Sequence, residues 1–319
     1  MSDADKKFVL LVAPLMDVLY DKLASAYHVC KLYEHPDPEE FLYTQGSQFR
    51  AIVTRGDIGV KTSLLEKLPA VGLIAVFGVG TDGIDLSYTR RNNIAVAVTV
   101  GVLTSDVADM AMGLMLSGAR KLCTGDRFVR SRTWESDTPA LGTQVSGKRI
   151  GIVGMGNIGQ AIAKRAQAFD MQISYNSRTE KKILPYTWHA DLITLAQESD
   201  FLVIAASGGA PTKNLINADV IAAMPVHAWL INIARGSMVD ESALIEALQK
   251  KRIGGAALDV FADEPNVPCE LLQLDNVVLQ PHVGSATHET RQKMCESVLA
   301  NMAAWFSGKT VPGELKSPL

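Results

Sequence analysis

Three residues with complementary chemistry, Arg235, Glu264 and His282, each follow a short apolar run of the kind that forms a buried strand. A guanidinium at such a position can hold a carboxylate through two parallel hydrogen bonds. Imidazole is the side chain best suited to exchange a proton near neutral pH, and a neighbouring carboxylate would fix its tautomer. Taken singly, each residue has an ordinary structural explanation. Together they predict a catalytic site that binds a carboxylic acid and moves a proton.

A glycine-rich run lies between the predicted strand Arg149 to Val153 and the helical pattern Ala161 to Phe169. In a dinucleotide-binding turn, the first glycine permits the tight turn, the second lets backbone amides approach a pyrophosphate, and the third lets the helix pack on the strand. The helix N-terminus then faces the anion. The run that we expect to bind a dinucleotide is Gly154-Met155-Gly156-Asn157-Ile158-Gly159.

The end of the next predicted strand indicates which dinucleotide binds. An NAD site should carry an acidic residue about 20 residues after the glycines, where it accepts from the ribose 2′-hydroxyl. Ser177, Arg178 and Thr179 occupy this place, with Lys181 close behind. Hydroxyls and a guanidinium suit a 2′-phosphate, whereas the alternative is a solvated basic turn. The sequence therefore predicts NADP(H) rather than NAD(H).

Short apolar runs alternate with longer helical patterns along the whole chain, which predicts an α/β fold with parallel strands. The first set of expected strands is Phe8 to Ala13, His28 to Tyr33, Ala51 to Thr54, Leu73 to Phe77 and Ile94 to Val98. The second set is Arg149 to Val153, Gln172 to Asn176, Phe201 to Ala205, Trp229 to Ile233, Ala256 to Val260 and Asn276 to Leu279.

Two doubly wound domains follow from these sets: a six-stranded Rossmann domain and a smaller flavodoxin-like domain. The helical patterns Thr104 to Arg120 and Glu289 to Phe306 are candidates for elements at which the chain crosses between domains. If the chain crosses twice, the first domain is discontinuous. In that case we predict a substrate domain of residues 1–101 and 283–319 and an NADP-binding domain of residues 102–282.

Composition excludes several classes of protein. The 319 residues are 47% hydrophobic and carry a formal net charge of -3, which offers no basic field for nucleic acid or an anionic membrane. The four cysteines are far apart and none pair at the spacing of a zinc or redox site, so we expect no metal and reduced thiols in the cytoplasm. The apolar run Phe8 to Ala13 is too short for a signal-peptide core or a membrane span.

The motifs GMGNIG, NIARG, DVFADEP and PHVGSAT occur in the order typical of the D-isomer-specific 2-hydroxyacid dehydrogenases. The chain resembles this family over nearly its whole length, including the segment FGVGTDGID from Phe77 to Asp85. It is most similar to the NADPH-dependent glyoxylate/hydroxypyruvate reductases and the related hydroxyphenylpyruvate and 2-ketogluconate reductases. The resemblance implies a two-domain oxidoreductase with its active site in the cleft between the domains.

The resemblance also implies roles for individual residues. Arg235 would bind the substrate carboxylate, His282 would donate or accept the proton, and Glu264 would support His282. Backbone amides near Val79 and Gly80 would meet the same carboxylate. The remaining residues that the likeness places at the cofactor are Thr104, Ile233, Ala234, Arg235, Asp259, His282 and Gly284, although Thr104 could instead cap a helix.

The expected reaction is NADPH-dependent reduction of a small 2-oxo acid to the D-2-hydroxy acid. Hydroxyphenylpyruvate and 2-ketogluconate are alternative substrates. A rival of another class is a dinucleotide-sensing protein like the corepressors that resemble this family, against which the complete set of three residues argues. A phosphoglycerate dehydrogenase-like enzyme conflicts with the missing acidic residue. A homodimer is implied by resemblance, with Ala108 to Arg120 either at the interface or buried within one chain.

Overall fold

The computed structural model describes residues 6–316, and the chain divides into two compact units. Unit 1 takes the residues up to Leu103 and those from Thr287 onward, and unit 2 is Thr104–Ala286. The chain therefore passes between the units twice. The divisions fall after Leu103 and Ala286, whereas the sequence placed them after residues 101 and 282.

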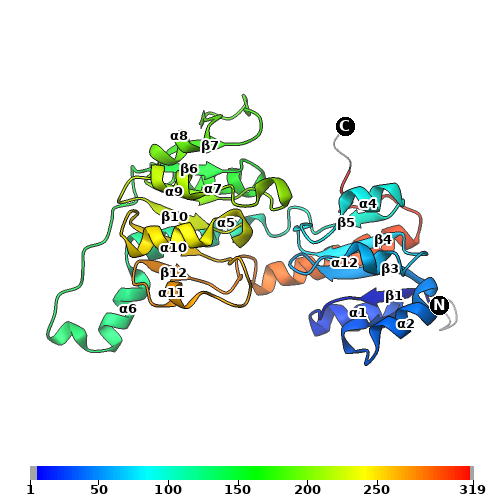
Figure 1. Ribbon diagram of the computed structural model, residues 1–319. Coiled ribbons are helices and arrows are strands. Elements are labelled where there is room, and N and C mark those ends of the chain that lie inside the picture. Colours follow the sequence, from blue (N-terminus) through cyan, green and yellow to red (C-terminus); the bar gives the residue numbers. More distant parts are fainter. Residues whose placement is uncertain (1–5, 317–319) are drawn as a thin grey trace. The chain divides into compact units, whose positions relative to one another are not determined.

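Unit 1 contains a sheet of parallel strands (Figure 1). In spatial order they are β2 (His28–Lys31), β1 (Phe8–Leu11), β3 (Phe49–Arg55), β4 (Leu73–Phe77) and β5 (Ala95–Ala97). The order 2-1-3-4-5 is that of flavodoxin-like sheets. Each strand covers most of an apolar run that the sequence indicated, so the α/β prediction is confirmed here.

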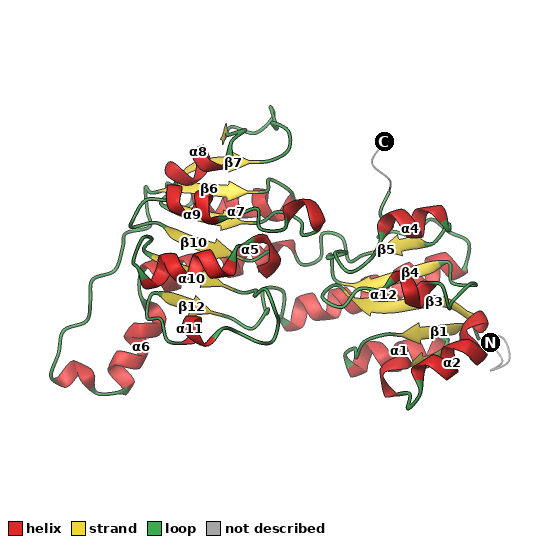
Figure 2. Cartoon of the chain, in the orientation of Figure 1, coloured by secondary structure: helices red, strands yellow, loops and turns green. Residues whose placement is uncertain are grey.

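Helices cover both faces of this sheet (Figure 2). Leu19 and Leu23 of α1 (Asp17–Ala26) share one apolar cluster with Met294 and Val298 of α12 (His288–Phe306). The other face is covered by α2 (Pro38–Gln45), α3 (Thr62–Leu65) and α4 (Leu86–Arg91), with η2 (Leu32–Glu34) and η3 (Gly46–Gln48) in the loops. Apolar side chains that alternate along buried strands thus fill two layers of core.

Unit 2 is built on a seven-stranded parallel sheet. In spatial order its strands are β12 (Val277–Leu279), β11 (Gly255–Leu258), β10 (Trp229–Asn232), β9 (Phe201–Ile204), β6 (Arg149–Val153), β7 (Gln172–Asn176) and β8 (Thr187–Trp188). From β8 to β11 this is the 3-2-1-4-5-6 order of a Rossmann domain. The prediction of six strands was wrong by one, because the two-residue strand β8 is too short to give a periodic pattern.

Two layers of helices also enclose the sheet of unit 2 (Figure 2). The helices α5 (Thr104–Ala119) and α7 (Asn157–Gln167) pack against each other on one face, while α8 (Leu192–Gln197), α9 (Ala218–Ala223) and α10 (Glu241–Gln249) cover the other. The remaining elements are α6 (Leu122–Arg130), α11 (Cys269–Leu272), η4 (Thr133–Glu135), η5 (Ala210–Thr212) and η6 (Gly236–Met238).

The apolar residues of α5 are buried within unit 2. Ala108, Ala111, Met115 and Ala119 are at most 2% exposed, and the helix packs on β10, β11 and α7. Gly118 lies so close to Trp229 that a Cβ atom would come within 2.4 Å of the indole. Of the two alternatives for Ala108 to Arg120, burial within one chain therefore accounts for these side chains.

None of the helices in residues 6–316 combines the length and the apolar character needed to cross a membrane.

Asp200 connects the N-terminal ends of three strands in unit 2. Its buried carboxylate accepts from the backbone amide of Arg149 at 2.9 Å, from the Arg149 guanidinium at 2.9 and 3.2 Å, and pairs with His227 Nε2 at 2.8 Å. Burial alone would raise the pKa of Asp200, but these donors lower it well below the ordinary value of 3.8. The ionised form of Asp200 is therefore favoured by folding.

Replacing Asp200 with asparagine should destabilise the protein at neutral pH by about 1–3 kcal/mol, because an amide leaves part of this buried donor set unsatisfied. A carboxyl with a lowered folded-state pKa stabilises the fold above its unfolded value, and this stabilisation is lost as the pH falls below it. The deficit of Asp200→Asn in urea unfolding should therefore shrink below pH 3.8. The exposed Asp21→Asn serves as control, and a deficit that is equal at all pH values would contradict the argument.

Candidate functional site

The predicted dinucleotide turn joins β6 to α7 in unit 2, and its three glycines have different surroundings. Gly154 has a φ of +97°, and a Cβ atom there would lie 2.5 Å from the backbone of Ala206. A Cβ atom on Gly159 would lie 2.1 Å from the Gly154 carbonyl oxygen, whereas Gly156 has no heavy atom within 4 Å of that position. Only glycine fits the first and third places, and the second is open to a ligand.

The N-terminus of α7 fits an anionic group. Its N-cap is the exposed Gly156, which supplies no side-chain cap, and the exposed Asn157 begins the helix. The amides of the first turn therefore remain available to a pyrophosphate, which the helix dipole also favours. The side chain of Met155 is buried, and that of Ile158 is half-buried. These observations satisfy the requirements of the phosphate-binding part of a dinucleotide site.

The basic run after β7 is exposed at the same end of the sheet. The glycine turn is tied to it because the Gly154 amide donates to the carbonyl oxygen of Asn176, the last residue of β7, at 2.9 Å. Arg178 and Thr179 are exposed, and the Ser177 hydroxyl donates to the Thr179 carbonyl at 2.7 Å. Within residues 6–316, the Arg178 guanidinium forms no hydrogen bond or ion pair. Its charge is therefore available to a phosphate.

Arg235 lies in a turn immediately after β10. The buried Asn232 holds this turn, because its amide donates to the Arg235 carbonyl at 2.9 Å and its oxygen accepts from the Ala234 amide at 3.0 Å. Ile233 and Ala234 are buried. A Cβ atom on Gly236 would come within 1.9 Å of the backbone of Phe261, so the turn packs directly against the segment after β11. The half-buried Arg235 is thereby fixed at a strand end.

His282 and Glu264 meet at the ends of the neighbouring strands β12 and β11. The His282 Nδ1 atom lies 2.7 Å from Glu264 Oε2, and the Phe261 amide donates to Glu264 Oε1 at 3.0 Å. The side chains are 35% and 30% exposed, so solvent or a substrate can reach both. His282 has a φ of +55°, a backbone conformation that is uncommon outside glycine. One oxygen of the Glu264 carboxylate is therefore held by the backbone, and the other contacts His282.

Asp259 fixes the loop that carries His282. Its buried carboxylate accepts from the amides of Val283 and Gly284, each at 2.8 Å. A Cβ atom on Gly284 would lie 2.8 Å from Asp259 Oδ2. Asp259 and Gly284 were expected at the cofactor. The structure shows that they also hold the loop of His282, which the sequence analysis missed. The signal that could have found it is a carboxylate that directly follows an apolar strand.

Burial and charge act differently on the two carboxyls of this region. Burial tends to raise the pKa of Glu264, but the hydrogen bonds from His282 and Phe261 and the charge of Arg235 hold it below the ordinary value. Burial raises the pKa of Asp259 despite its two amide donors. The positive charge of Arg235 is one of the causes that lower the pKa of Glu264, so Arg235 acts on the same carboxylate that contacts His282. This arrangement can bind an anion and transfer a proton beside it.

Val79 and Gly80 belong to unit 1, in the loop after β4. Gly78 has a φ of +140°, and a Cβ atom on Gly56 would come within 3.2 Å of the Gly80 amide nitrogen. Val79 is 39% exposed. Arg291 of α12 lies over the ring of Phe77, with its Cζ atom 5.7 Å from the ring centre. Val79 in this loop is therefore accessible, and the half-buried guanidinium of Arg291 lies over the last residue of the strand before it.

Thr104 is the first residue of α5 in unit 2 and is half-buried. In residues 6–316, no cluster of three or more His, Cys, Asp or Glu side chains has the grouping that a metal ion would need.

Comparison with known proteins gives a consistent result. Residues 112–284 match the model of the D-isomer specific 2-hydroxyacid dehydrogenase, NAD binding domain. The chain is 44% identical to a glyoxylate/hydroxypyruvate reductase of Arabidopsis thaliana over 95% of this chain and 97% of that protein. It is 43% identical to a 2-ketogluconate reductase of Gluconobacter oxydans over 97% and 98% of the two chains.

A solved structure shares the fold of the whole chain. The NADPH-dependent glyoxylate/hydroxypyruvate reductase of Sinorhizobium meliloti, in complex with NADP and malonate, superposes with a TM-score of 0.90. The two sequences are 34% identical, and the alignment covers 98% of this chain and 97% of the other.

Proposed function

Since the chain belongs to the D-isomer specific 2-hydroxyacid dehydrogenase family, we propose that it reduces a small 2-oxo acid with NADPH and forms the D-2-hydroxy acid. Glyoxylate and hydroxypyruvate are the substrates that we favour. The observation that carries the proposal is the hydrogen bond of 2.7 Å between His282 and Glu264, at strand ends beside Arg235. The 2-ketogluconate reductase among the relatives keeps a sugar-derived acid as an alternative, and hydroxyphenylpyruvate is another.

Arg235, Glu264, His282 and Asp259 of unit 2 have different roles in the proposed reaction. Arg235 binds the carboxylate of the substrate through its planar fork of donors. Glu264 accepts the Nδ1 proton of His282, which leaves Nε2 as the atom that donates a proton to the substrate carbonyl oxygen. Asp259 keeps the His282 loop in place through the amides of Val283 and Gly284. When bound, NADPH supplies the hydride for the carbonyl carbon.

The cofactor is held, in this proposal, at the glycine turn Gly154 to Gly159 and at the basic run Ser177 to Thr179. The roles of Ile233, Ala234, Arg235 and Asp259 at the nicotinamide half stay predictions from the resemblance. The same holds for the contact of Thr104 with the cofactor and for the binding of substrate by Val79 and Gly80. On the same footing we assign unit 2 to the cofactor and unit 1 to the substrate.

The function is tested by initial rates of oxidation of NADPH and NADH with hydroxypyruvate and with glyoxylate. We expect turnover with a clear preference for NADPH. Arg178→Ala should raise the KM for NADPH by about 10-fold or more and leave that for NADH nearly unchanged, because only NADPH carries the 2′-phosphate that pairs with the guanidinium. Arg252→Ala in the same unit is the control. Equal effects on both cofactors would refute the phosphate assignment, and a folded protein that binds NADPH without turnover would favour a sensing role.

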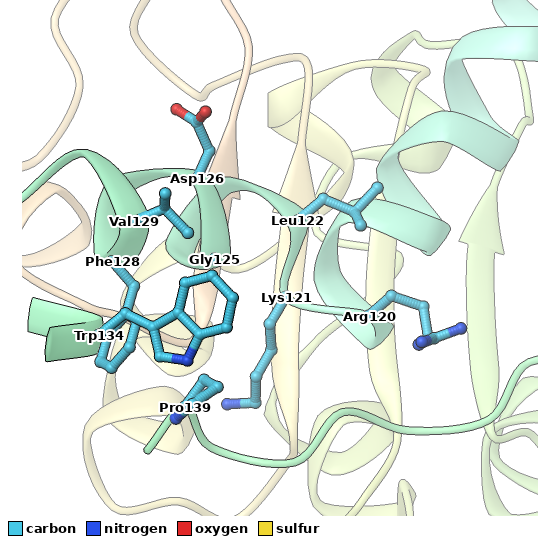
Figure 3. A pocket seen from close by; sticks show the side chains of 9 residues that line it. All are labelled: Arg120, Lys121, Leu122, Gly125, Asp126, Phe128, Val129, Trp134 and Pro139. Carbon is cyan, nitrogen blue, oxygen red and sulfur yellow. The ribbon is translucent and has the colours of Figure 1, made fainter. Parts of the chain in front are cut away.

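We propose further that the protein is a homodimer whose contact includes the segment 120–139. No residue of α6 is buried, and Leu122, Val129 and Trp134 are each more than 50% exposed. A cavity of about 370 Å³ lies there, with the Trp134 ring beside Phe128 and Pro139 (Figure 3). A short helix with no buried face gains little stability from propensity alone, so a second copy that covers it would stabilise it.

Sedimentation should give a mass of twice that of the chain, and Trp134→Asp should shift the protein toward the monomer, because a charge on an apolar contact must be desolvated. Leu272→Asp is the control, because Leu272 of α11 is itself 61% exposed. A wild-type monomer at all concentrations would overturn this proposal. Cytoplasmic location and the absence of a nucleic-acid partner stay predictions from cysteine spacing and charge.

A further inference from the structure

The basic run after β7 lies in a loop, residues 177–186, that returns to the sheet as β8. Ser177, Arg178, Thr179 and the residues behind them include three cations and one carboxylate up to Lys182. Arg178, Thr179 and Glu180 are exposed, and a loop of this length would ordinarily sample many conformations. Hydrogen bonds on either side of these three residues would therefore limit the conformations of the loop.

Tyr175 holds the loop on the C-terminal side of the three exposed residues. Its side chain is completely buried, at 0% exposure, and its hydroxyl oxygen accepts from the backbone amide of Lys181 at 2.8 Å. Leu184 in turn donates its amide to the Lys181 carbonyl at 2.9 Å. A rigid core residue thus fixes the backbone at Lys181.

Trp188 holds the loop on the N-terminal side of the three exposed residues. Its indole Nε1 donates to the carbonyl oxygen of Ser177 at 3.1 Å. Trp188 is itself placed by β8, which pairs in parallel with β7 so that Trp188 stands opposite Tyr175. The His189 amide donates to the Tyr175 carbonyl at 2.8 Å, and the Asn176 side-chain amide donates to the His189 carbonyl at 2.9 Å. The edge strand β8 therefore places the indole of Trp188 where it can bond to the first residue of the loop.

We propose that Trp188 and Tyr175 are positioning residues for cofactor discrimination, which hold the backbone on both sides of Arg178 to Glu180 so that Arg178 and Thr179 face one phosphate. This inference rests on the proposed NADPH dependence. Neither side chain needs to touch the cofactor. They act by limiting the conformations of the loop before the cofactor binds. Ordering a mobile loop costs conformational entropy and weakens binding, so a loop that is already ordered binds more tightly.

The first test is calorimetric titration of Trp188→Phe with NADPH and with NADH. Phenylalanine keeps an aromatic ring but lacks the N–H donor, so the Kd for NADPH should rise by about 3- to 10-fold, the effect of one hydrogen bond. The Kd for NADH should change by less than about 2-fold, because NADH carries no 2′-phosphate. Tyr175→Phe, which removes only the hydroxyl, should act in the same direction. The controls lie in unit 1: Trp305→Phe at a tryptophan that is half-buried like Trp188, and Tyr43→Phe at an exposed tyrosine.

The second test reads the loop without cofactor. Trypsin cleaves after Arg178, Lys181 and Lys182, and cleavage there should be several-fold faster in Trp188→Phe and Tyr175→Phe than in the wild type or the controls, because local opening exposes the backbone. Mass spectrometry identifies the cut. Unchanged cleavage, or equal weakening of NADPH and NADH binding by both variants, would overturn the inference. A wild-type protein without preference for NADPH would instead overturn the proposed function, while the cleavage rates would still report whether the two side chains hold the loop.

Discussion

Replacing His282 with alanine should lower kcat for reduction of hydroxypyruvate or glyoxylate by about 10²- to 10⁴-fold, the usual contribution of a positioned general acid. The Nδ1 atom of His282 is committed to Glu264 at 2.7 Å, so one ring nitrogen remains to protonate the substrate oxygen. The side chain is 35% exposed and fills no core, and its removal should therefore leave the fold intact. Steady-state rates with saturating NADPH measure the loss.

Cofactor affinity distinguishes a chemical from a structural role of His282. The loop is held by Asp259 through the amides of Val283 and Gly284, and these contacts do not involve the imidazole. The Kd for NADPH in His282→Ala should thus stay within about 3-fold of the wild type, and the melting temperature should stay close to it. His35→Ala, an exposed histidine of unit 1, is the control. A parallel loss of NADPH binding and thermal stability would show that His282 maintains the loop instead.

Much of the fold could be predicted because its signals are local. Each βα unit carries an apolar run and an amphipathic helix, and the glycines of residues 154–159 have a spacing that only a turn onto a helix N-terminus requires. The family resemblance added the prediction that the loop after β4 binds the substrate. These signals placed most strands of both sheets and the turns that carry Arg235, Glu264 and His282.

The features that could not be predicted depend on contacts between distant residues. Strand β8 is two residues long, and Trp188 is in a strand because it pairs with Tyr175 rather than because of its neighbours in sequence. The hydrogen bonds from the Val283 and Gly284 amides to Asp259 join residues that are 24 and 25 positions apart in the sequence. The exposure of α6 has no sequence signal, since its residues form an ordinary helical pattern that would suit a buried face equally well.

Replacing Arg235 with glutamine should reduce kcat/KM for the 2-oxo acids by about 10²- to 10³-fold, because it removes one partner of a charge-assisted pair from a half-buried site. The turn itself should persist, since Asn232 holds it through the backbone of Ala234 and Arg235, and the guanidinium adds a bond from Nη1 to the Ala234 carbonyl at 2.7 Å. Arg235→Lys should recover only part of the loss, because an ammonium keeps the charge but lacks the planar fork.

The substrates themselves decide what Arg235 recognises. Glyoxylate and hydroxypyruvate share the carboxylate and differ only beyond the carbonyl carbon, so Arg235→Gln should weaken kcat/KM for both by the same factor while the Kd for NADPH stays unchanged. Arg252→Gln, exposed in the same unit, should change neither. If hydroxypyruvate alone were affected, Arg235 would contact the hydroxymethyl end, and the carboxylate would have to be bound by other donors. The charge of Arg235 already lowers the pKa of Glu264, so in the proposed reaction one guanidinium would both attract the acid and stabilise the carboxylate that contacts His282.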